Sequence, residues 1–204
     1  MLSEILQILI VLFLAVVFHE CAHGWVAYRL GDPTAKEAGR LTLNPLKHID
    51  PVGMLVVPLV LKLLNFKFVI GWAKPVPVNF NRLRNPRRDM IWVALAGPMT
   101  NFSLAFVLSR FLPLSPTFFV YKTLALAVLI NLIIGFFNLI PIPPLDGSRV
   151  VMGLLPVGIS RKMAQVEPYG FVVLLVLLNL GLFNFIWVLA VLIAALLKVN
   201  LNII

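Results

Sequence analysis

The chain has 204 residues, of which 61% are hydrophobic and only 12% are charged, with a mean hydropathy of +1.01. No stretch is both long and polar enough to fold alone in water, so the composition predicts a polytopic membrane protein with no separate soluble domain. A net charge of +9 would suggest a nucleic-acid partner in a soluble protein. Here the charges cluster between apolar runs, which indicates membrane topology and argues against nucleic-acid binding.

The first apolar run predicts a membrane span from about Ile5 to Leu30, which Gly31-Asp32-Pro33 should end. No basic segment and no small-residue cleavage site mark the N-terminus, so we expect a retained helix and not a cleaved signal peptide. His19 lies about 15 Å before Arg29 by helical rise. The polar residues around it are therefore inside the membrane, towards the C-terminal end of that helix.

His19, Glu20 and His23 form the pattern His-Glu-x-x-His, the signature of zinc metalloproteases. Two imidazoles four residues apart lie on one face of a helix and can hold one metal ion. The glutamate can then take a proton from a water that the metal activates. A charged residue at the centre of a membrane helix costs about 2.5–3.5 kcal/mol, so such groups indicate a function.

The region between the first and second spans mixes polar and apolar segments. Ala35–Pro51 is polar and turn-rich, whereas Met54–Leu64 is apolar but short and holds a proline, which predicts a re-entrant or interfacial helix. Phe66–Trp72, which is apolar with one lysine and one glycine, is expected to be extended. The proline-rich Lys74–Asn79 should be extended too, because a proline disfavours helix at the residue before it. A basic cluster follows at Arg82–Arg88.

Two further spans are predicted, at about Met90–Leu112 and Thr123–Ile140, followed by a second basic loop from Arg149 to Lys162. The apolar C-terminal region, about 165–200, is broken at Asn179-Leu180-Gly181 and forms either one kinked span or a pair of short helices. We therefore expect an all-α polytopic fold and a single membrane-embedded domain over residues 1–204. Its three-helix core spans about 5–149, and its C-terminal helices about 165–200.

The distribution of lysine and arginine predicts the orientation. Arg29–Arg88 holds 11 of the 17 basic residues, Arg149–Lys162 holds three, and Arg110–Lys122 holds two. The positive-inside rule places the first two regions in the cytoplasm and the N-terminus outside. If Met54–Leu64 crossed the membrane, the basic sequences on its two sides would face opposite compartments, which favours the re-entrant alternative.

A catalytic zinc site usually has three protein ligands and one open position. Among the eight acidic residues, Asp146 fits best, because it follows the third span at the cytoplasmic end. The first and third spans run in the same direction, so their inner ends lie at the same depth. Asp146 is therefore predicted to complete the set with His19 and His23, within irregular backbone imposed by prolines and Gly147.

At this point the chain resembles the site-2 protease family of intramembrane zinc proteases. His19–His23 matches the family's metal helix, and Asn138–Gly147 (Asn-Leu-Ile-Pro-Ile-Pro-Pro-Leu-Asp-Gly) is similar to its second motif, which supplies the aspartate ligand. Ala96–Asn101 (Ala-Gly-Pro-Met-Thr-Asn) is similar to the element on the intervening helix. The resemblance implies a three-helix catalytic core with one zinc ion near the cytosolic face and cleavage of a transmembrane protein substrate. It also implies a prokaryotic plasma membrane.

On this interpretation His19, His23 and Asp146 bind one Zn²⁺, and Glu20 is the general base. Asn138 and Asn101 would hold the substrate backbone or the developing oxyanion, although both could equally join helices by hydrogen bonds. The extended Lys74–Asn79 segment could pair with an unwound substrate. The oligomeric state is not indicated.

Two other functions fit a membrane protein of this composition. A catalytically inactive membrane-protein binder could keep the fold, but it would have no use for the general base Glu20. A metal transporter is the second alternative, yet transporters often show internal repeats and polar groups along a path, and neither is evident in this chain.

Overall fold

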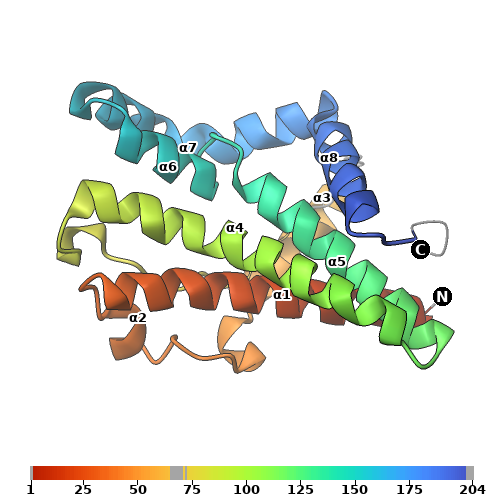
Figure 1. Cartoon of the computed structure of the whole chain (residues 1–204). Coiled ribbons are helices and arrows are strands. Elements are labelled where there is room, and N and C mark those ends of the chain that lie inside the picture. Colours follow the sequence, from red (N-terminus) through yellow and green to blue (C-terminus); the bar gives the residue numbers. More distant parts are fainter. Residues whose placement is uncertain (1, 65–70, 72, 201–204) are drawn as a thin grey trace.

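The computed structural model describes residues 2–64, 71 and 73–200, and all regular structure in these residues is helical (Figure 1). The helices in chain order are α1 (Leu2–Arg29), α2 (Thr34–Glu37), α3 (Val57–Leu63), α4 (Pro86–Phe111), α5 (Phe118–Asn138), α6 (Asp146–Leu154), α7 (Val157–Asn179) and α8 (Leu182–Leu196). Short 3₁₀ turns lie at Pro45–His48, Phe80–Arg82 and Leu112–Leu114, and a π-helical turn lies at Val52–Val56. The prediction of an all-α polytopic membrane protein is confirmed.

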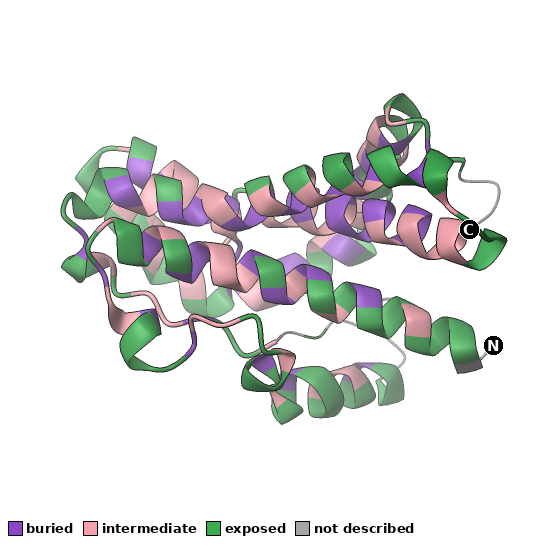
Figure 2. Cartoon of the chain, turned by 60° about the horizontal axis from the view of Figure 1, so that its bottom comes forward, coloured by how far each residue is buried: buried purple, intermediate pink, exposed green. Residues whose placement is uncertain are grey.

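Three helical segments of the described chain are each long and apolar enough to cross a bilayer. They are Ser3–Arg29, Pro86–Leu114 and Phe118–Asn138, close to the three predicted spans. α4 packs against both α1 and α5, which also contact each other, so the three form one bundle of neighbouring helices (Figure 1). At most 39% of the residues in their most apolar windows are buried. The green outer faces in Figure 2 are therefore surface that lipid can cover.

Small residues allow the helices to approach closely. Ala105 of α4, Ala125 of α5 and Ala190 of α8 are fully buried in one apolar cluster. Gly135 of α5 faces the ring of Phe102, and a Cβ atom added there would lie 2.6 Å from Phe102 Cε1. Close helix–helix packing through small residues is typical of membrane proteins, where lipid is as apolar as the side chains it would replace.

The segment between α1 and α4 does not cross the bundle as a long helix. The π-helical turn and α3 together form an apolar helix of 12 residues, Val52–Leu63, which is too short to span a membrane. This agrees with the short apolar helix predicted here. The predicted extended stretch Phe66–Trp72 lies outside the described residues apart from Gly71. Residues 73–79 belong to no helix, and Asn79 has extended φ and ψ angles of −105° and 95°.

The C-terminal third differs from prediction in one respect. The basic residues expected in a loop, Arg149 to Lys162, lie on α6 and on the first turns of α7. Pro156 separates these two helices without forming a long loop, and Arg149 pairs with Glu167 across them. The apolar end consists of two helices with a sharp bend between them, which fits either predicted alternative, one kinked span or a pair of helices. Gly181, at a φ of +104°, joins α7 to α8 at a bend of 72°.

Candidate metal centre

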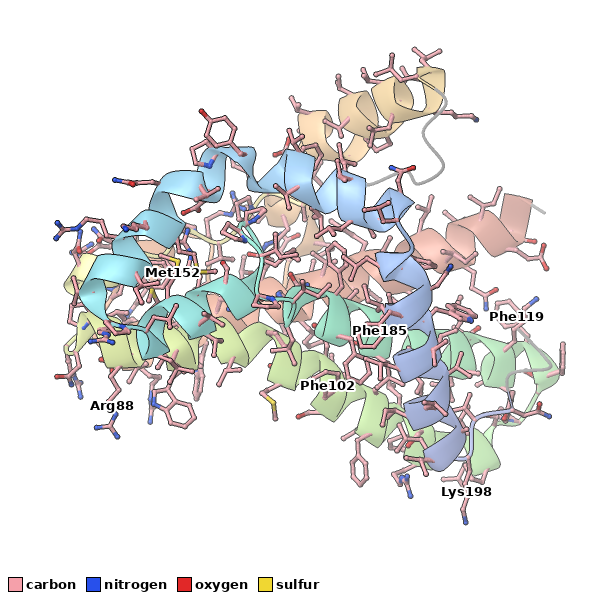
Figure 3. All side chains as sticks on the ribbon, turned by 90° about the horizontal axis from the view of Figure 1, so that it is seen from above. Arg88, Phe102, Phe119, Met152, Phe185 and Lys198 are labelled. Carbon is pink, nitrogen blue, oxygen red and sulfur yellow. The ribbon has the colours of Figure 1, made fainter. Side chains whose placement is uncertain are left out.

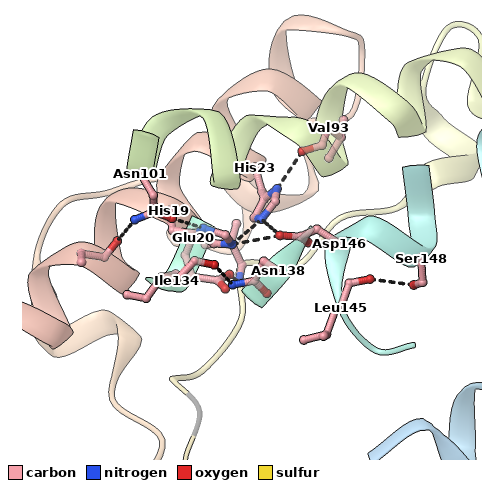
Figure 4. Close-up of polar contacts among 12 residues, drawn as sticks. His19, Glu20, His23, Val93, Asn101, Ile134, Asn138, Leu145, Asp146 and Ser148 are labelled. Atoms are coloured by element: carbon pink, nitrogen blue, oxygen red, sulfur yellow. Dashed lines mark hydrogen bonds and ion pairs between the residues drawn. The ribbon is translucent and has the colours of Figure 1, made fainter. Parts of the chain in front are cut away.

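Three predicted metal ligands converge where α1 meets the start of α6 (Figure 4). The Nε2 atoms of His19 and His23 are 3.0 Å apart. Asp146 Oδ2 lies 3.0 Å from the first and 3.2 Å from the second. Both histidines are buried, and Asp146 is partly buried. The two histidines are one helical turn apart, but Asp146 comes 123 residues after His23, so the fold brings this set together as the sequence predicted.

A tight reversal after α5 brings Asp146 to this place. Gly147 packs so closely on the preceding chain that an added Cβ would lie 2.2 Å from the carbonyl oxygen of Leu139. Only glycine fits there, and Leu145 is buried behind it. The irregular backbone predicted around the prolines is present at residues 139–145, which belong to no helix. Asp146 itself begins α6, where the positive end of the helix dipole favours a carboxylate.

In each histidine the nitrogen that faces away from the cluster, Nδ1, lies within hydrogen-bond distance of an acceptor oxygen. His23 Nδ1 donates to the carbonyl oxygen of Val93 over 2.7 Å. His19 Nδ1 is 2.6 Å from Asn101 Oδ1, and it donates there because the Asn101 amide nitrogen is already bonded to Asn131. A neutral imidazole carries one N–H, so both Nε2 atoms are left with lone pairs directed into the cluster.

The chemistry and spacing of the atoms in the cluster fit a bound metal ion. The two Nε2 atoms and the Asp146 carboxylate are all acceptors, and Asp146 Oδ2 is buried without a hydrogen-bond partner. A cation among them would satisfy all three atoms at once. Bonds of about 2.0–2.1 Å in tetrahedral geometry place ligand atoms about 3.3 Å apart, near the 3.0–3.2 Å observed. The donor set of two imidazoles and one carboxylate therefore suits zinc.

α4 covers the cluster with a glycine. A Cβ atom added to Gly97 would lie 2.4 Å from His23 Nε2 and 2.5 Å from His19 Nε2. Gly97 and Pro98 are both buried, so the α4 backbone itself forms one wall of the site. The sequence singled out this Gly-Pro pair as a motif, but it did not reveal that the missing side chain leaves room for the imidazoles.

Glu20 lies beside the cluster and is held by the backbone of another segment. Its Oε2 accepts a hydrogen bond of 2.8 Å from the N–H of Val76. Because Pro75 and Pro77 have no N–H, Val76 is the donor at this point of the chain. The Val76 side chain packs against Gly24 of α1, where an added Cβ would come within 2.7 Å of it. A contact to backbone leaves no signature in sequence, so this one was missed.

The two predicted asparagines occupy different environments. Asn138 is the last residue of α5, half-buried, and its amide nitrogen donates to the carbonyl of Ile134 one turn earlier. Asn101 is fully buried, and its amide is bonded to His19, Ala15 and Asn131. For Asn101 these contacts favour the alternative of a hydrogen bond between helices. Asn131 was missed, although a lone asparagine inside an apolar span was the signal that could have found it.

Comparison with known proteins finds a peptidase family and relatives that are named as zinc metalloproteases. Residues 115–180 match the model of Peptidase family M50, a region that includes Asn138 and Asp146. YwhC of Bacillus subtilis (strain 168), named as a candidate zinc metalloprotease, is 40% identical over 86% of this chain and 81% of its own length. Rip2 of Mycolicibacterium smegmatis (strain ATCC 700084 / mc(2)155), named in the same way, is 30% identical over 81% of this chain and 63% of its own.

A third relative is archaeal. The zinc metalloprotease MJ0392 of Methanocaldococcus jannaschii (strain ATCC 43067 / DSM 2661 / JAL-1 / JCM 10045 / NBRC 100440) is 26% identical over 72% of this chain and 33% of its own length. No solved structure gives a significant match. The identity to YwhC along most of both proteins, together with the family-model match, shows that the chain belongs to peptidase family M50, the site-2 protease family of zinc metalloproteases.

Proposed function

We propose that this protein hydrolyses peptide bonds in or near the transmembrane segments of membrane-anchored proteins, close to the cytosolic face. His19, His23 and Asp146 would hold one zinc ion, and Glu20 would be the general base. The observation that carries this proposal is the convergence of three acceptor atoms within 3.2 Å of one another. Two of them, and the neighbouring glutamate, belong to an apolar helix long enough to span a bilayer. The whole chain would act as one membrane-embedded protease unit.

Zinc, when bound, supplies a Lewis acid that polarises the scissile carbonyl and makes a water more acidic. Glu20 takes a proton from that water as the water attacks, and returns it to the leaving amine. The N–H of Val76 holds one carboxylate oxygen of Glu20, which leaves the other free to receive the proton. The outer bonds of the histidines, to Val93 and Asn101, keep the imidazoles oriented throughout.

The substrate has to be unwound before it is cut, because a helix hides its peptide bonds. Residues 73–79 belong to no helix, pass beside Glu20, and could pair with an extended substrate segment by β-augmentation. Asn138 is only half-buried and keeps one amide hydrogen beyond its bond to Ile134, so it could hold the substrate carbonyl or the oxyanion. The substrate class is therefore a transmembrane protein with a segment that unwinds.

The proposed orientation has the N-terminus outside and the site towards the cytosol. Arg88, within the predicted basic cluster, lies at one end of the molecule, and Phe119 and Lys198 lie at the other (Figure 3). The positive-inside rule assigns the Arg88 end to the cytoplasm. The relatives described above come from bacteria and an archaeon, which supports the plasma membrane of a prokaryote as the location.

The test compares the wild type with Glu20→Gln, both purified in detergent. Bound zinc is measured in each, together with cleavage of a panel of single-span reporter proteins. We expect both proteins to hold one zinc, and Glu20→Gln to cleave about 10²- to 10⁴-fold more slowly, because it has lost the general base. Zinc in both with equal cleavage would reject the role of Glu20. Zinc without cleavage in either would favour the inactive binder, and zinc carried across vesicle membranes would favour the transporter.

A further inference from the structure

Asn131 lies in the middle of the third span, where a polar side chain is expensive unless it has a partner. It is buried, with a relative exposure of 3%, and its helical neighbours on both sides are apolar and buried. Its side chain is bonded to Asn101 of α4 and to the carbonyl of Ala127. Asn101 in turn bonds His19. A chain of hydrogen bonds therefore runs from α5 to the metal cluster.

The direction of every bond in this chain is fixed by the group at its far end. The Ala127 carbonyl can only accept, so Asn131 turns its amide nitrogen towards it, at 2.8 Å, and its Oδ1 towards Asn101. Asn131 Oδ1 accepts from Asn101 Nδ2 over 2.8 Å, which directs Asn101 Oδ1 to His19 Nδ1 at 2.6 Å. The N–H of His19 then lies on Nδ1, and Nε2 keeps its lone pair for the cluster.

We propose that Asn131 is a positioning residue for the metal centre, which sets the tautomer and orientation of His19 through the amide of Asn101. The inference rests on the role of His19 as a zinc ligand proposed above. Asn101 also donates to the carbonyl of Ala15 over 3.3 Å, a longer bond than the one to Asn131. Asn131 therefore holds the Asn101 amide more firmly than α1 does, and without Asn131 that amide can turn.

The two histidines differ in this respect. His23 is oriented by the backbone carbonyl of Val93, which no side-chain substitution removes. His19 depends on two side chains in series. If the Asn101 amide turned, its NH₂ group would face His19 Nδ1, and the imidazole proton would move to Nε2, where it competes with the metal. Loss of such an outer partner typically weakens metal binding about 10- to 100-fold.

The test uses three variants that separate positioning from packing. Asn131→Leu keeps the number and branching of the side-chain heavy atoms but removes the acceptor for Asn101. Asn131→Asp, in the neutral protonated form that an apolar span favours, donates its O–H to the Ala127 carbonyl and keeps an oxygen that accepts from Asn101 Nδ2, so it should restore the orientation of Asn101. Leu132→Ala alters the neighbouring buried side chain, in the apolar cluster that α5 forms with α4 and α8, and leaves the hydrogen-bonded chain intact. Each protein is purified with detergent and phospholipid, and its unfolding midpoint is measured.

Zinc affinity is measured by competition with a chelator, and the Co²⁺-substituted proteins give a visible spectrum that reports the ligand geometry. We expect Asn131→Leu to bind zinc about tenfold more weakly and to change the cobalt spectrum. Asn131→Asp should stay near the wild type, and Leu132→Ala should lower the unfolding midpoint without changing either metal measurement.

Two outcomes would overturn the inference. One is that Asn131→Leu binds zinc with the same affinity as the wild type and gives the same cobalt spectrum. The other is the same loss of affinity in Leu132→Ala as in Asn131→Leu, since that would make the effect a consequence of packing. A wild type that holds no zinc would be a different failure, because it would reject the proposed function itself before the variants are compared.

Discussion

The three proposed metal ligands differ in the hydrogen bonds that hold them. His23 bonds to a backbone carbonyl, His19 bonds to a side-chain amide, and Asp146 Oδ2 has no hydrogen-bond partner at all. A buried acceptor without a partner costs free energy, about 1–3 kcal/mol or more for a charged group. That cost is removed when a cation occupies the cluster, so the arrangement of these acceptor atoms favours metal binding.

Gly97 gives the first prediction at the scale of single residues. Gly97→Ala would place a methyl group within 2.5 Å of both imidazoles, and the α4 backbone cannot easily retreat because Pro98 and Asn101 are buried beside it. We expect zinc affinity to fall by at least about tenfold, as displaced ligands bind weakly. The measurement is zinc retention against a chelator in the purified protein.

Gly158→Ala is the matched control for that change, since it is also a glycine in a helix and an added Cβ there meets nothing within 4 Å. It should retain zinc like the wild type and lose no stability, because alanine is favoured over glycine in a helix. Wild-type zinc affinity in Gly97→Ala would show that the site tolerates a side chain on this wall and would contradict the close packing described here.

The segment 73–79 is the element whose position matters most for Glu20. Arg40 is buried and donates from Nη2 to the carbonyl oxygen of Lys74 at 2.8 Å, while the N–H of Lys74 donates to the carbonyl of His48 at 2.9 Å. At its other end, the N–H of Asn79 donates to Asp32 over 2.6 Å. These bonds fix the segment on both sides of Val76, so the hydrogen bond to Glu20 depends on residues outside the His19–His23–Asp146 cluster.

Arg40→Ala tests this arrangement. The segment should loosen near Lys74, Val76 should lose its alignment with Glu20, and cleavage should slow by about 10- to 100-fold with zinc still bound. Lys47→Ala is the control, because it removes an exposed basic residue from the same connection. The measurement is the cleavage rate of a reporter at equal zinc content. If Arg40→Ala lost zinc, or if both variants slowed cleavage equally, Arg40 would not act solely by aligning Val76 with Glu20.

For the molecule as a whole, hydropathy over about 20 residues was enough to find the three spans, and turn residues located their ends to within a few positions. Because the first and third spans run in the same direction across the membrane, the sequence was also enough to predict that Asp146 lies near the two histidines. The charged start of α7 was mistaken for a loop, because polar residues at a helix end resemble a connection. The contacts of Val76 and Asn131 could not be predicted, since one uses backbone and the other joins residues 30 positions apart.

The orientation in the membrane is the prediction that concerns the whole chain. Cys21 is the only cysteine, so Cys21→Ala gives a background in which one new cysteine can be labelled. Ser3 and Arg84 are both exposed, and Ser3 lies in the first turn of α1 whereas Arg84 lies beyond its C-terminal end. We expect a membrane-impermeant maleimide to label Ser3→Cys in intact cells, and to label Arg84→Cys only after the membrane is opened, because basic segments remain in the cytoplasm.

Detergent-solubilised protein provides the control, in which both cysteines should react. If Arg84→Cys reacted in intact cells and Ser3→Cys did not, the chain would be inverted and the metal cluster would face the outer side. His19 and His23 lie in the C-terminal half of α1, so the side on which α1 ends determines the compartment that supplies water to the site and receives the cleaved product. This labelling pattern therefore decides whether substrates are cut near the cytosolic face.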